Sequence, residues 1–239
     1  MTKSLLFIIA LTCSFHLFSQ LITTTNTENT SGFFDTTTNV YFETDVFSVS
    51  RDLMPNEAHL NTPLGNRENE TPLTCSSFTL GISLPLNTVL KLNTGLCFLQ
   101  NGESYNWNSV NTDSSFAYQT SFKYIGMPIQ LSIEYGNKIS IYGALGVSPA
   151  IFNSYLQKSQ WTNELGSSDS EETSIQDNCS SFIISFRGNL GIHYHINDHF
   201  GVQLSALYRR QLNNTYKEYE DYIHKAYSIG FNLSTSYQF

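Results

Sequence analysis

The last stretch of the chain, residues 227–239, constrains the fold more than any other. Large apolar side chains alternate with small or polar ones throughout, Thr235 fills the one gap, and the stretch ends on the aromatic Phe239. Such alternation is typical of a β-strand with one apolar and one polar face. Strands in soluble proteins usually have about 5–6 residues, whereas a tilted strand needs about 9–11 residues to cross a bilayer. Length and period together therefore favour a transmembrane strand.

Seven further segments repeat this alternation: 39–50, 76–86, 89–99, 122–135, 139–150, 181–196 and 200–208. Three connections between them are short (87–88, 136–138 and 197–199), and the other four are long and polar (51–75, 100–121, 151–180 and 210–225). Short turns on one side and long loops on the other are typical of outer-membrane barrels. A soluble β-sandwich would not sort its loops by length in this way. We expect an all-β fold, an eight-stranded antiparallel up-and-down transmembrane β-barrel with both termini on the periplasmic side.

The N-terminus predicts export. Lys3 precedes a short apolar run, and Ser19 supplies a small residue before a cleavage site, so residues 1–19 have the pattern of a signal peptide. Residues 20–38 are rich in Thr and Asn and carry no useful period, which indicates a loose periplasmic segment. Residues 39–239 would then form the barrel, and the expected location is the cell outer membrane.

The phase of the charged residues supports a closed barrel. An Arg or Lys that faces lipid at the bilayer midplane costs about 2–4 kcal/mol, and the charges at this depth lie on the polar face of their segments. An eight-stranded barrel is just wide enough for side chains to fill. We therefore expect an ion-pair network that closes the lumen, formed by Lys91, Glu134, Arg187, Arg209, Glu43 and Asp45.

Aromatic residues gather near the predicted strand ends, as in the two interfacial girdles of membrane barrels. Phe98, Phe122 and Tyr227 lie near the long loops, and Tyr237 and Phe239 lie near the short turns. The aromatic C-terminus of Tyr237 and Phe239 also predicts an assembly signal for the barrel-assembly machinery.

Composition excludes some functions. The formal net charge is −8 with only 12 Lys and Arg, so nucleic acid is not an expected partner, because binding to it depends on neutralising phosphates. Beyond the signal peptide the chain has three cysteines, Cys75, Cys97 and Cys179. An odd number rules out a fully paired disulfide framework, and unreactive thiols are expected.

The histidines allow a metal site without requiring one. His193 and His195 share one face of a strand about 6.5–7 Å apart, and His199 follows in the next turn. No cysteine or carboxylate at matching spacing accompanies them beyond Asp198, so lumen histidines beside carboxylates are the preferred interpretation. We expect no metal, no cofactor and no catalytic residues. The chain has no G-x-S-x-G motif, and we expect it not to be an enzyme.

The long loops carry the remaining candidates. Trp107 and Trp161 stand among Asn, Ser and acidic residues, and exposed aromatic residues are enriched in binding surfaces. We expect these two residues to contact an unknown protein or glycan partner, or lipopolysaccharide, in addition to the outer-membrane lipid around the barrel. A mobile acidic surface without a ligand explains the same pattern.

Three motifs add a family resemblance: G-I-S-L-P-L-N-T-V-L-K-L-N-T-G-L-C-F at 81–98, Y-I-G-M-P-I-Q-L-S-I-E-Y at 124–135 and I-Y-G-A-L-G-V-S-P at 141–149. Together with the aromatic C-terminus, their order resembles that of the small outer-membrane β-barrels of Gram-negative bacteria, a porin-like family that includes PorT-type proteins. The resemblance covers most of residues 39–239 and brings no catalytic residues with it. It implies a non-enzymatic structural or surface-interaction role. The alternative that it suggests is an accessory component of envelope transport or protein secretion, and an enzyme acting on lipid ranks third.

Overall fold

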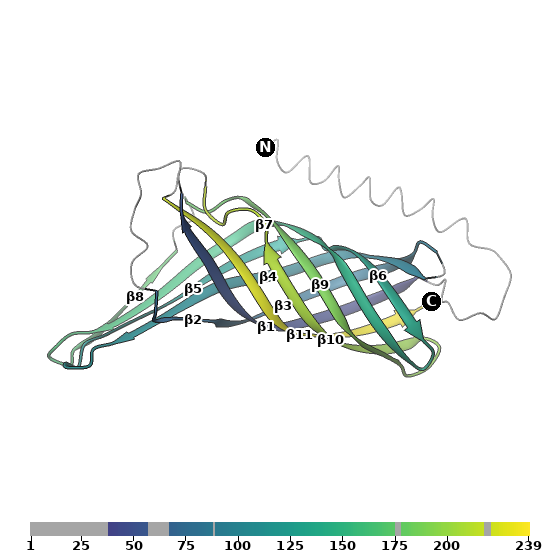
Figure 1. Ribbon diagram of the computed structural model, residues 1–239, viewed down its shortest axis with the longest axis horizontal. Coiled ribbons are helices and arrows are strands. Elements are labelled where there is room, and N and C mark those ends of the chain that lie inside the picture. The colour runs from purple at the N-terminus through teal and green to yellow at the C-terminus, as the bar shows by residue number, and fades with distance from the viewer. Residues whose placement is uncertain (1–37, 57–66, 88, 175–177, 218–220) are drawn as a thin grey trace. The chain divides into compact units, whose positions relative to one another are not determined.

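The computed structural model describes residues 38–56, 67–87, 89–174, 178–217 and 221–239 (Figure 1). The predicted signal peptide and all but the last residue of the predicted periplasmic segment lie outside this part of the chain. No helix in the described residues is long and apolar enough to cross a bilayer. The strands are β1 (Asn39–Pro55), β2 (Glu70–Thr71), β3 (Leu73–Pro85), β4 (Leu90–Asn108), β5 (Ser115–Gly126), β6 (Ile129–Gly136), β7 (Ile139–Thr162), β8 (Ser168–Thr173), β9 (Phe182–His195), β10 (Phe200–Gln211) and β11 (Tyr222–Gln238).

The strands close into a ring of antiparallel pairs. β1 pairs with β3 on one side and with β11 on the other, and the ring continues through β4, β5 with β6, β7, β9 and β10 back to β11. β5 and β6 together form one wall position, because both lie between β4 and β7. The break between them falls at Met127 and Pro128, where proline has no N–H for the ladder. The predicted eight-stranded antiparallel barrel is confirmed.

The outer wall of the barrel is apolar. Large side chains point outward from every wall position, with exposed fractions such as 66% for Leu190 and 68% for Phe231. The alternate residues face the lumen and are mostly polar and buried, as Ser205 and Asn232 are. Because the ring leaves no open sheet edge, a closed barrel with this outer wall satisfies its backbone hydrogen bonds within a hydrocarbon layer. This arrangement agrees with the location in the cell outer membrane.

The turns and loops divide the barrel into two ends. At the short-turn end, the side chain of Asn87 accepts hydrogen bonds from the backbone of Val89 and Leu90, and Asn197 does the same for His199 and Phe200. At the opposite, long-loop end, the strands run further than the alternation predicted. The expected loops 51–75, 100–121, 151–180 and 210–225 are therefore wrong in extent.

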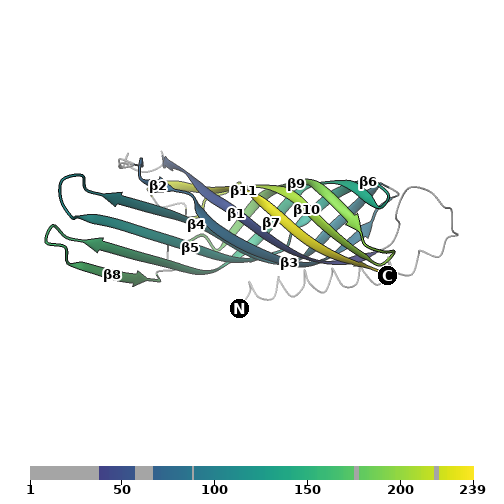
Figure 2. The same cartoon turned by 90° about the horizontal axis from the view of Figure 1, so that it is seen from below.

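Three strands extend furthest at the long-loop end. β4 continues to Asn108, β5 begins at Ser115, and β7 reaches Thr162 before turning back into β8. Residues 104–108, 115–121, 154–162 and 168–173 pair in the order β4, β5, β7 and β8, and we call them the extension sheet; its two hairpins project in Figure 2. Neither face of this sheet is continuously apolar, so the pattern that marks lipid-facing strands is missing although the ladder continues.

A β-bulge in β7 changes which residues face inward. Tyr124 pairs with Phe152, but its neighbour Lys123 pairs with Ser154, so Asn153 is an extra residue in the ladder. Below the bulge the even-numbered residues of β7, such as Ser148 and Ala150, are buried in the lumen. Above it the odd-numbered residues pair with inward residues of β5, because a one-residue offset reverses the faces of a strand.

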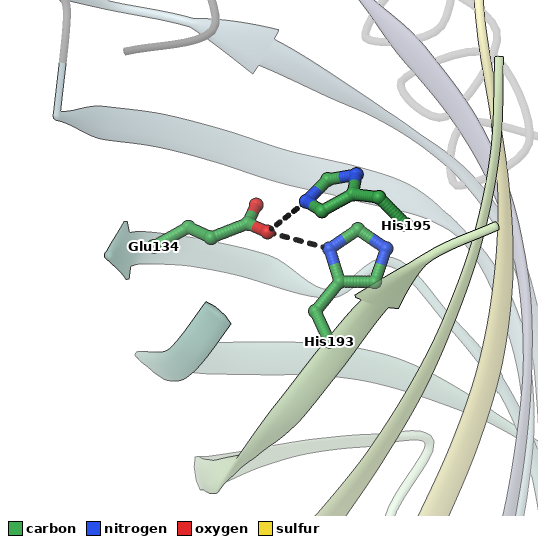
Figure 3. Close-up of side chains that lie close together, drawn as sticks. All are labelled: Glu134, His193 and His195. Carbon is green, nitrogen blue, oxygen red and sulfur yellow. Dashed lines mark hydrogen bonds and ion pairs between the residues drawn. The ribbon is translucent and has the colours of Figure 1, made fainter. Parts of the chain in front are cut away.

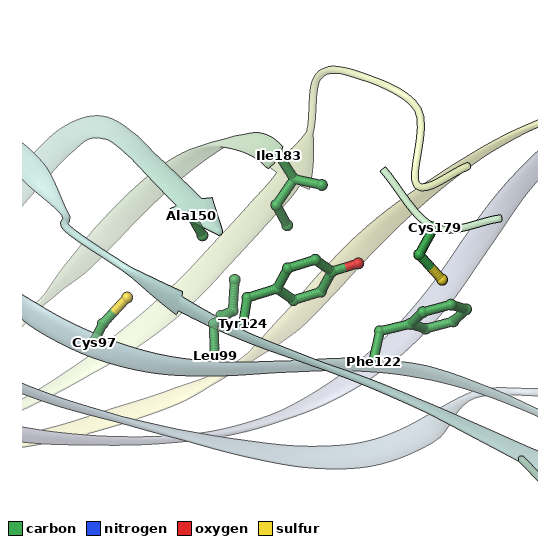
Figure 4. Close-up of a cluster of buried hydrophobic side chains, with 7 residues drawn as sticks. All are labelled: Cys97, Leu99, Phe122, Tyr124, Ala150, Cys179 and Ile183. Carbon is green, nitrogen blue, oxygen red and sulfur yellow. The ribbon is translucent and has the colours of Figure 1, made fainter. Parts of the chain in front are cut away.

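Apolar side chains fill the lumen toward the long-loop end (Figure 4). Phe122 and Ile183 are fully buried and pack in a cluster with Tyr124, Leu99 and Cys179. The placement of Phe122 in an interfacial girdle was therefore wrong: it shares its face with Tyr124 and points into the barrel. Within the described residues, the three cysteines form no disulfide.

Candidate functional site

A carboxylate and two imidazoles meet in the lumen at the short-turn end (Figure 3). Glu134 comes from β6, and His193 and His195 come from β9. Nδ1 of His193 lies 2.7 Å from Oε1 of Glu134, and Nε2 of His195 lies 2.8 Å from the same oxygen. The two imidazole rings have centroids 4.3 Å apart. One oxygen and two nitrogens, all atoms that can ligate a metal, therefore converge on a single point.

Strand register explains this convergence. β7 lies between β6 and β9, and its Ser140 pairs with Gly136 on one side and with His193 on the other. Glu134 lies two residues before Gly136 on the same lumen-facing side of β6, and its side chain crosses β7 to reach the imidazoles. The hydroxyl of Ser140 donates a hydrogen bond to Oε1 of Glu134. Alternation along the strands predicts the lumen face for these three residues, but it does not predict that Glu134 meets the histidines.

The surroundings of His193 fix its ring. Its Nε2 lies 3.3 Å from the hydroxyl of Ser236 on β11. Gly201 on β10 makes room for the ring, because a Cβ at that position would overlap Nε2. On the other side of the cluster, Nζ of Lys91 lies 3.6 Å from Oε2 of Glu134. The carboxylate therefore has imidazoles at one oxygen and an ammonium group at the other.

A small cavity of about 40 Å³ adjoins the cluster. Glu134 and His193 line it together with Lys91 and Ser236. The side chain of His193 is only 7% exposed, whereas that of His195 is 29% exposed. Water and small ions can therefore approach the cluster from the side of His195.

The predicted ion-pair network is divided into separate parts. At mid-lumen, Nη2 of Arg187 contacts Glu43 and lies 3.0 Å from Oδ1 of Asp45. Asn232 and Ser77 donate further hydrogen bonds to Asp45, at 2.7 and 2.6 Å. Lys91 and Glu134 belong instead to the histidine cluster at the short-turn end.

Arg209 does not join either group. It donates a 2.6 Å hydrogen bond to Oδ1 of Asn101, and its guanidinium lies 4.4 Å from the ring centroid of Phe47. Among the described residues it forms no ion pair, which corrects its predicted place in the network. The amide of Asn101 and the ring of Phe47, both on the lumen face, take the place of a carboxylate partner.

A further charged group at the long-loop end was not predicted. Arg51 donates to Glu70 at 2.8 Å and to Glu103 at 2.5 Å, and Arg67 also binds Glu70, at 2.9 Å. Burial by itself would raise the pKa of Glu70, but hydrogen bonds from Arg67 and Arg51 outweigh it and lower that pKa to about 2. Arg51, Arg67 and Glu70 fall in the predicted loop 51–75, where no period of the sequence indicates which residues pair.

His224 also takes an unexpected place. It lies on β11 and not in a loop, and it is 1% exposed. Its Nδ1 lies 2.7 Å from the hydroxyl of Thr215, and its Nε2 lies 3.0 Å from Glu103. A hydroxyl, an imidazole and a carboxylate in this order have the connectivity of a nucleophilic triad. The Thr215 residue is only 1% exposed and its hydroxyl accepts a hydrogen bond from Gln211, so the arrangement offers no surface to a substrate.

The extension sheet brings Trp107 and Trp161 into one row. Trp107 pairs with Phe116, and Phe116 pairs with Trp161 on its other side. These three residues share the face that continues the lumen wall, and each is between 37% and 39% exposed. The rings of Tyr105 and Tyr118 stack beside them with centroids 5.4 Å apart. We call these five residues the aromatic row.

The C-terminal aromatics lie at the short-turn end. Tyr237 packs against Phe200 with ring centroids 5.0 Å apart, and against Phe239 at 5.2 Å. Phe239 is 73% exposed. Tyr237 near the end of β11 and Phe239 just after it therefore form an accessible aromatic C-terminus, and its role as an assembly signal stays a prediction.

Comparisons with known proteins give likeness in structure and not in sequence. No family model matches the chain, and no curated protein matches its sequence. Solved structures similar to it include the outer membrane protein OprG from Pseudomonas aeruginosa, at a TM-score of 0.43 and 12% identity, covering 88% of this chain and 99% of that chain. Neisserial surface protein A is similar at a TM-score of 0.37 and 11% identity, covering 84% and 97%.

A third similar structure is the outer membrane protease OmpT from Escherichia coli, at a TM-score of 0.46 and 10% identity, covering 88% of this chain and 99% of that chain. The closed ring of antiparallel strands and its apolar outer wall decide the class of this protein. The chain is an outer-membrane β-barrel protein. Two candidate sites lie at opposite ends of the barrel. Glu134, His193 and His195 form the histidine cluster at the short-turn end, and the aromatic row lies at the long-loop end.

Proposed function

We propose that this outer-membrane barrel is a non-enzymatic surface-interaction protein that binds a partner through the aromatic row. The observation that carries the proposal is the register of the extension sheet, which sets Trp107, Phe116 and Trp161 side by side on adjacent strands. Tryptophan and tyrosine dominate the energetics of binding surfaces because they offer large, rigid contact areas. In the expected orientation, the extension sheet projects from the cell.

Charge narrows the class of partner. Residues 104–121 and 154–174 carry five carboxylates and one lysine, Lys158. On β8, Asp169 pairs with Trp161 and Glu171 pairs with Ser159, so both carboxylates lie on the face of the aromatic row. Negative charge there opposes the phosphates of lipopolysaccharide and favours positive charge on the partner. We therefore expect a protein partner that presents apolar and basic side chains, in preference to a glycan or lipopolysaccharide.

Site-specific photo-crosslinking in intact cells tests this proposal. A photoreactive phenylalanine derivative at position 116 should give a discrete protein adduct, because this position is at the centre of the row. The matched control carries the same group at Gln160, which neighbours Trp161 on the opposite face of β7. Trp161→Ala in the Phe116 variant should abolish the adduct, and Gln160→Ala should leave it unchanged.

Three outcomes would overturn the proposal: no adduct at position 116, equal adducts at both positions, or an adduct that survives Trp161→Ala. Adducts that contain only lipopolysaccharide or polysaccharide would show that the partner is a lipopolysaccharide or a glycan and not a protein. A strain that lacks this protein distinguishes the surface-interaction role from the accessory role suggested by the resemblance to PorT-type proteins. Loss of secreted cargo with no loss of adhesion would favour an accessory role in envelope transport or secretion.

A further inference from the structure

A cluster of three potential metal ligands lies at the other end of the barrel, independent of the aromatic row. We propose that Glu134, His193 and His195 bind a divalent transition-metal ion of the Zn²⁺ class at the short-turn mouth of the lumen. The three potential ligand atoms all lie within 4.8 Å of one another. In the expected orientation, this mouth opens to the periplasm.

The set of ligand atoms defines the class of ion. Two imidazole nitrogens and one carboxylate oxygen suit Zn²⁺ and its neighbours in the first transition row, whereas Mg²⁺ and Ca²⁺ prefer oxygen ligands alone. Two histidines with one glutamate make a three-ligand set that leaves one coordination position open. The ion would therefore keep a water molecule or bind a small anion at the fourth position, on the side of the cavity.

The distances require only a small adjustment. Zinc bonds to nitrogen and oxygen at about 2.0–2.2 Å, so tetrahedral ligand atoms stand about 3.3 Å apart. The nitrogens of His193 and His195 now lie 2.7 and 2.8 Å from Oε1 of Glu134. Each pair must open by roughly half an ångström to admit an ion. Rotation about side-chain bonds supplies this movement without moving β6 or β9, and the partly exposed His195 has the most room to turn.

The surroundings of the ligands match those of metal sites. A histidine ligand usually donates its second ring N–H to a neighbouring group, which fixes the tautomer. With an ion bound, the hydroxyl of Ser236, 3.3 Å from Nε2 of His193, can accept this hydrogen bond, which leaves the lone pair of Nδ1 for the ion. The ring has this position because Gly201 leaves space for it. The hydroxyl of Ser140 holds the carboxylate in place.

Lys91 sets the strength of binding. Its ammonium group lies 3.6 Å from Oε2 of Glu134, on the side of the carboxylate away from the imidazoles. It keeps the oxygen that faces the histidines open to an ion, but its charge repels a cation in a buried setting. Lys91→Met should therefore tighten metal binding, an effect that a site formed by unrelated surface groups would not show.

Cobalt provides a direct probe. Co²⁺ in a tetrahedral site with nitrogen and oxygen ligands absorbs visible light, and Zn²⁺ displaces it without absorbing. The full chain, purified in detergent without a polyhistidine tag, should develop these bands at one Co²⁺ per barrel and lose them when Zn²⁺ is added. His195→Ala and Glu134→Gln should each weaken binding more than tenfold, because each removes or neutralises one ligand.

His199→Ala is the matched control. His199 lies in the adjoining turn, where its Nδ1 contacts the backbone carbonyl of Gln238 at 3.1 Å, outside the cluster. This variant should bind Co²⁺ as the parent chain does, and heat-dependent electrophoretic migration should verify that every variant forms a barrel. Absence of saturable absorption in the parent chain would overturn the proposal. Equal binding by His195→Ala and His199→Ala would overturn it as well, and would reduce the cluster to a hydrogen-bonded lumen group.

Discussion

Arg187→Met would remove the guanidinium that contacts two buried carboxylates at mid-lumen. The side chains of Glu43 and Asp45 are 9% and 1% exposed, and both contact Nη2 of Arg187. Without it, two like charges remain side by side with little access to water. Removing one partner of a buried ion pair costs about 3–5 kcal/mol, because the other charge is left without compensation.

A loss of this size is easily measured. Since each 1.4 kcal/mol is a factor of about ten, the ratio of folded to unfolded barrel should fall by a factor of roughly a hundred to a few thousand. Urea unfolding of the barrel in lipid vesicles, followed by far-ultraviolet circular dichroism, gives the free energy of unfolding. Trp107 and Trp161 are the two tryptophans of the chain, and their fluorescence reports separately on the extension sheet.

A triple variant distinguishes charge from packing. Glu43→Gln, Asp45→Asn and Arg187→Met together remove all three charges and keep similar side-chain volumes. Replacing a complete buried ion pair by neutral groups is often nearly neutral or even stabilising, so the triple variant should recover most of the lost stability. If it is as unstable as Arg187→Met alone, the loss comes from packing and the reasoning is refuted.

Three further outcomes follow from other parts of the barrel. Leu190→Arg places a charge on the lipid face at mid-wall and should cost about 2–4 kcal/mol of unfolding free energy in vesicles; an unchanged value would mean that Leu190 does not face lipid. Phe239→Ala should lower the fraction of chain recovered in the outer membrane, and equal recovery would contradict an assembly role for this residue. Because the pKa of Glu70 is lowered from 4.5 to about 2, its ion pairs stabilise the long-loop end above pH 4.5, and this stability is lost as the pH falls toward 2. Thermal melts between pH 5 and 2 should show this decline, and Glu70→Gln should make the curve flatter over that window.

The fold could be predicted because lipid imposes a pattern on the sequence. Every outward position at membrane depth must be apolar, so residues such as Phe231 and Leu233 mark both the strand and its face. Beyond the bilayer this constraint ends. Polar residues of the extension sheet, such as Ser104 and Gln157, pair in the same ladders, but nothing in their order distinguishes them from a loop.

The candidate sites could be predicted only in part, for a different reason. Periodicity assigns Glu134, His193 and His195 to the lumen face, but it does not say which lumen residues meet across the barrel. That depends on the register through β7, where Ser140 links both sides. For Phe122, the period of the strand indicates the inward face that it shares with Tyr124. Its aromatic side chain near a strand end instead suggested an interfacial girdle, and that prediction was wrong.

The single extra residue at Asn153 has a consequence for how β7 can change. Even-numbered residues of β7 face the lumen before Asn153, and odd-numbered residues face it after Asn153. This change places Trp161 opposite Phe116. Deleting Asn153 would remove the bulge and bring Ser154 directly after Phe152 in the ladder, so the pairs of residues 154–162 with β5 would be kept. Ser159 and Trp161 would stay on the inner face, and Lys158 and Gln160 would stay on the outer face. The bulge therefore lets β7 lose one residue at this point without changing the membrane wall or the aromatic row.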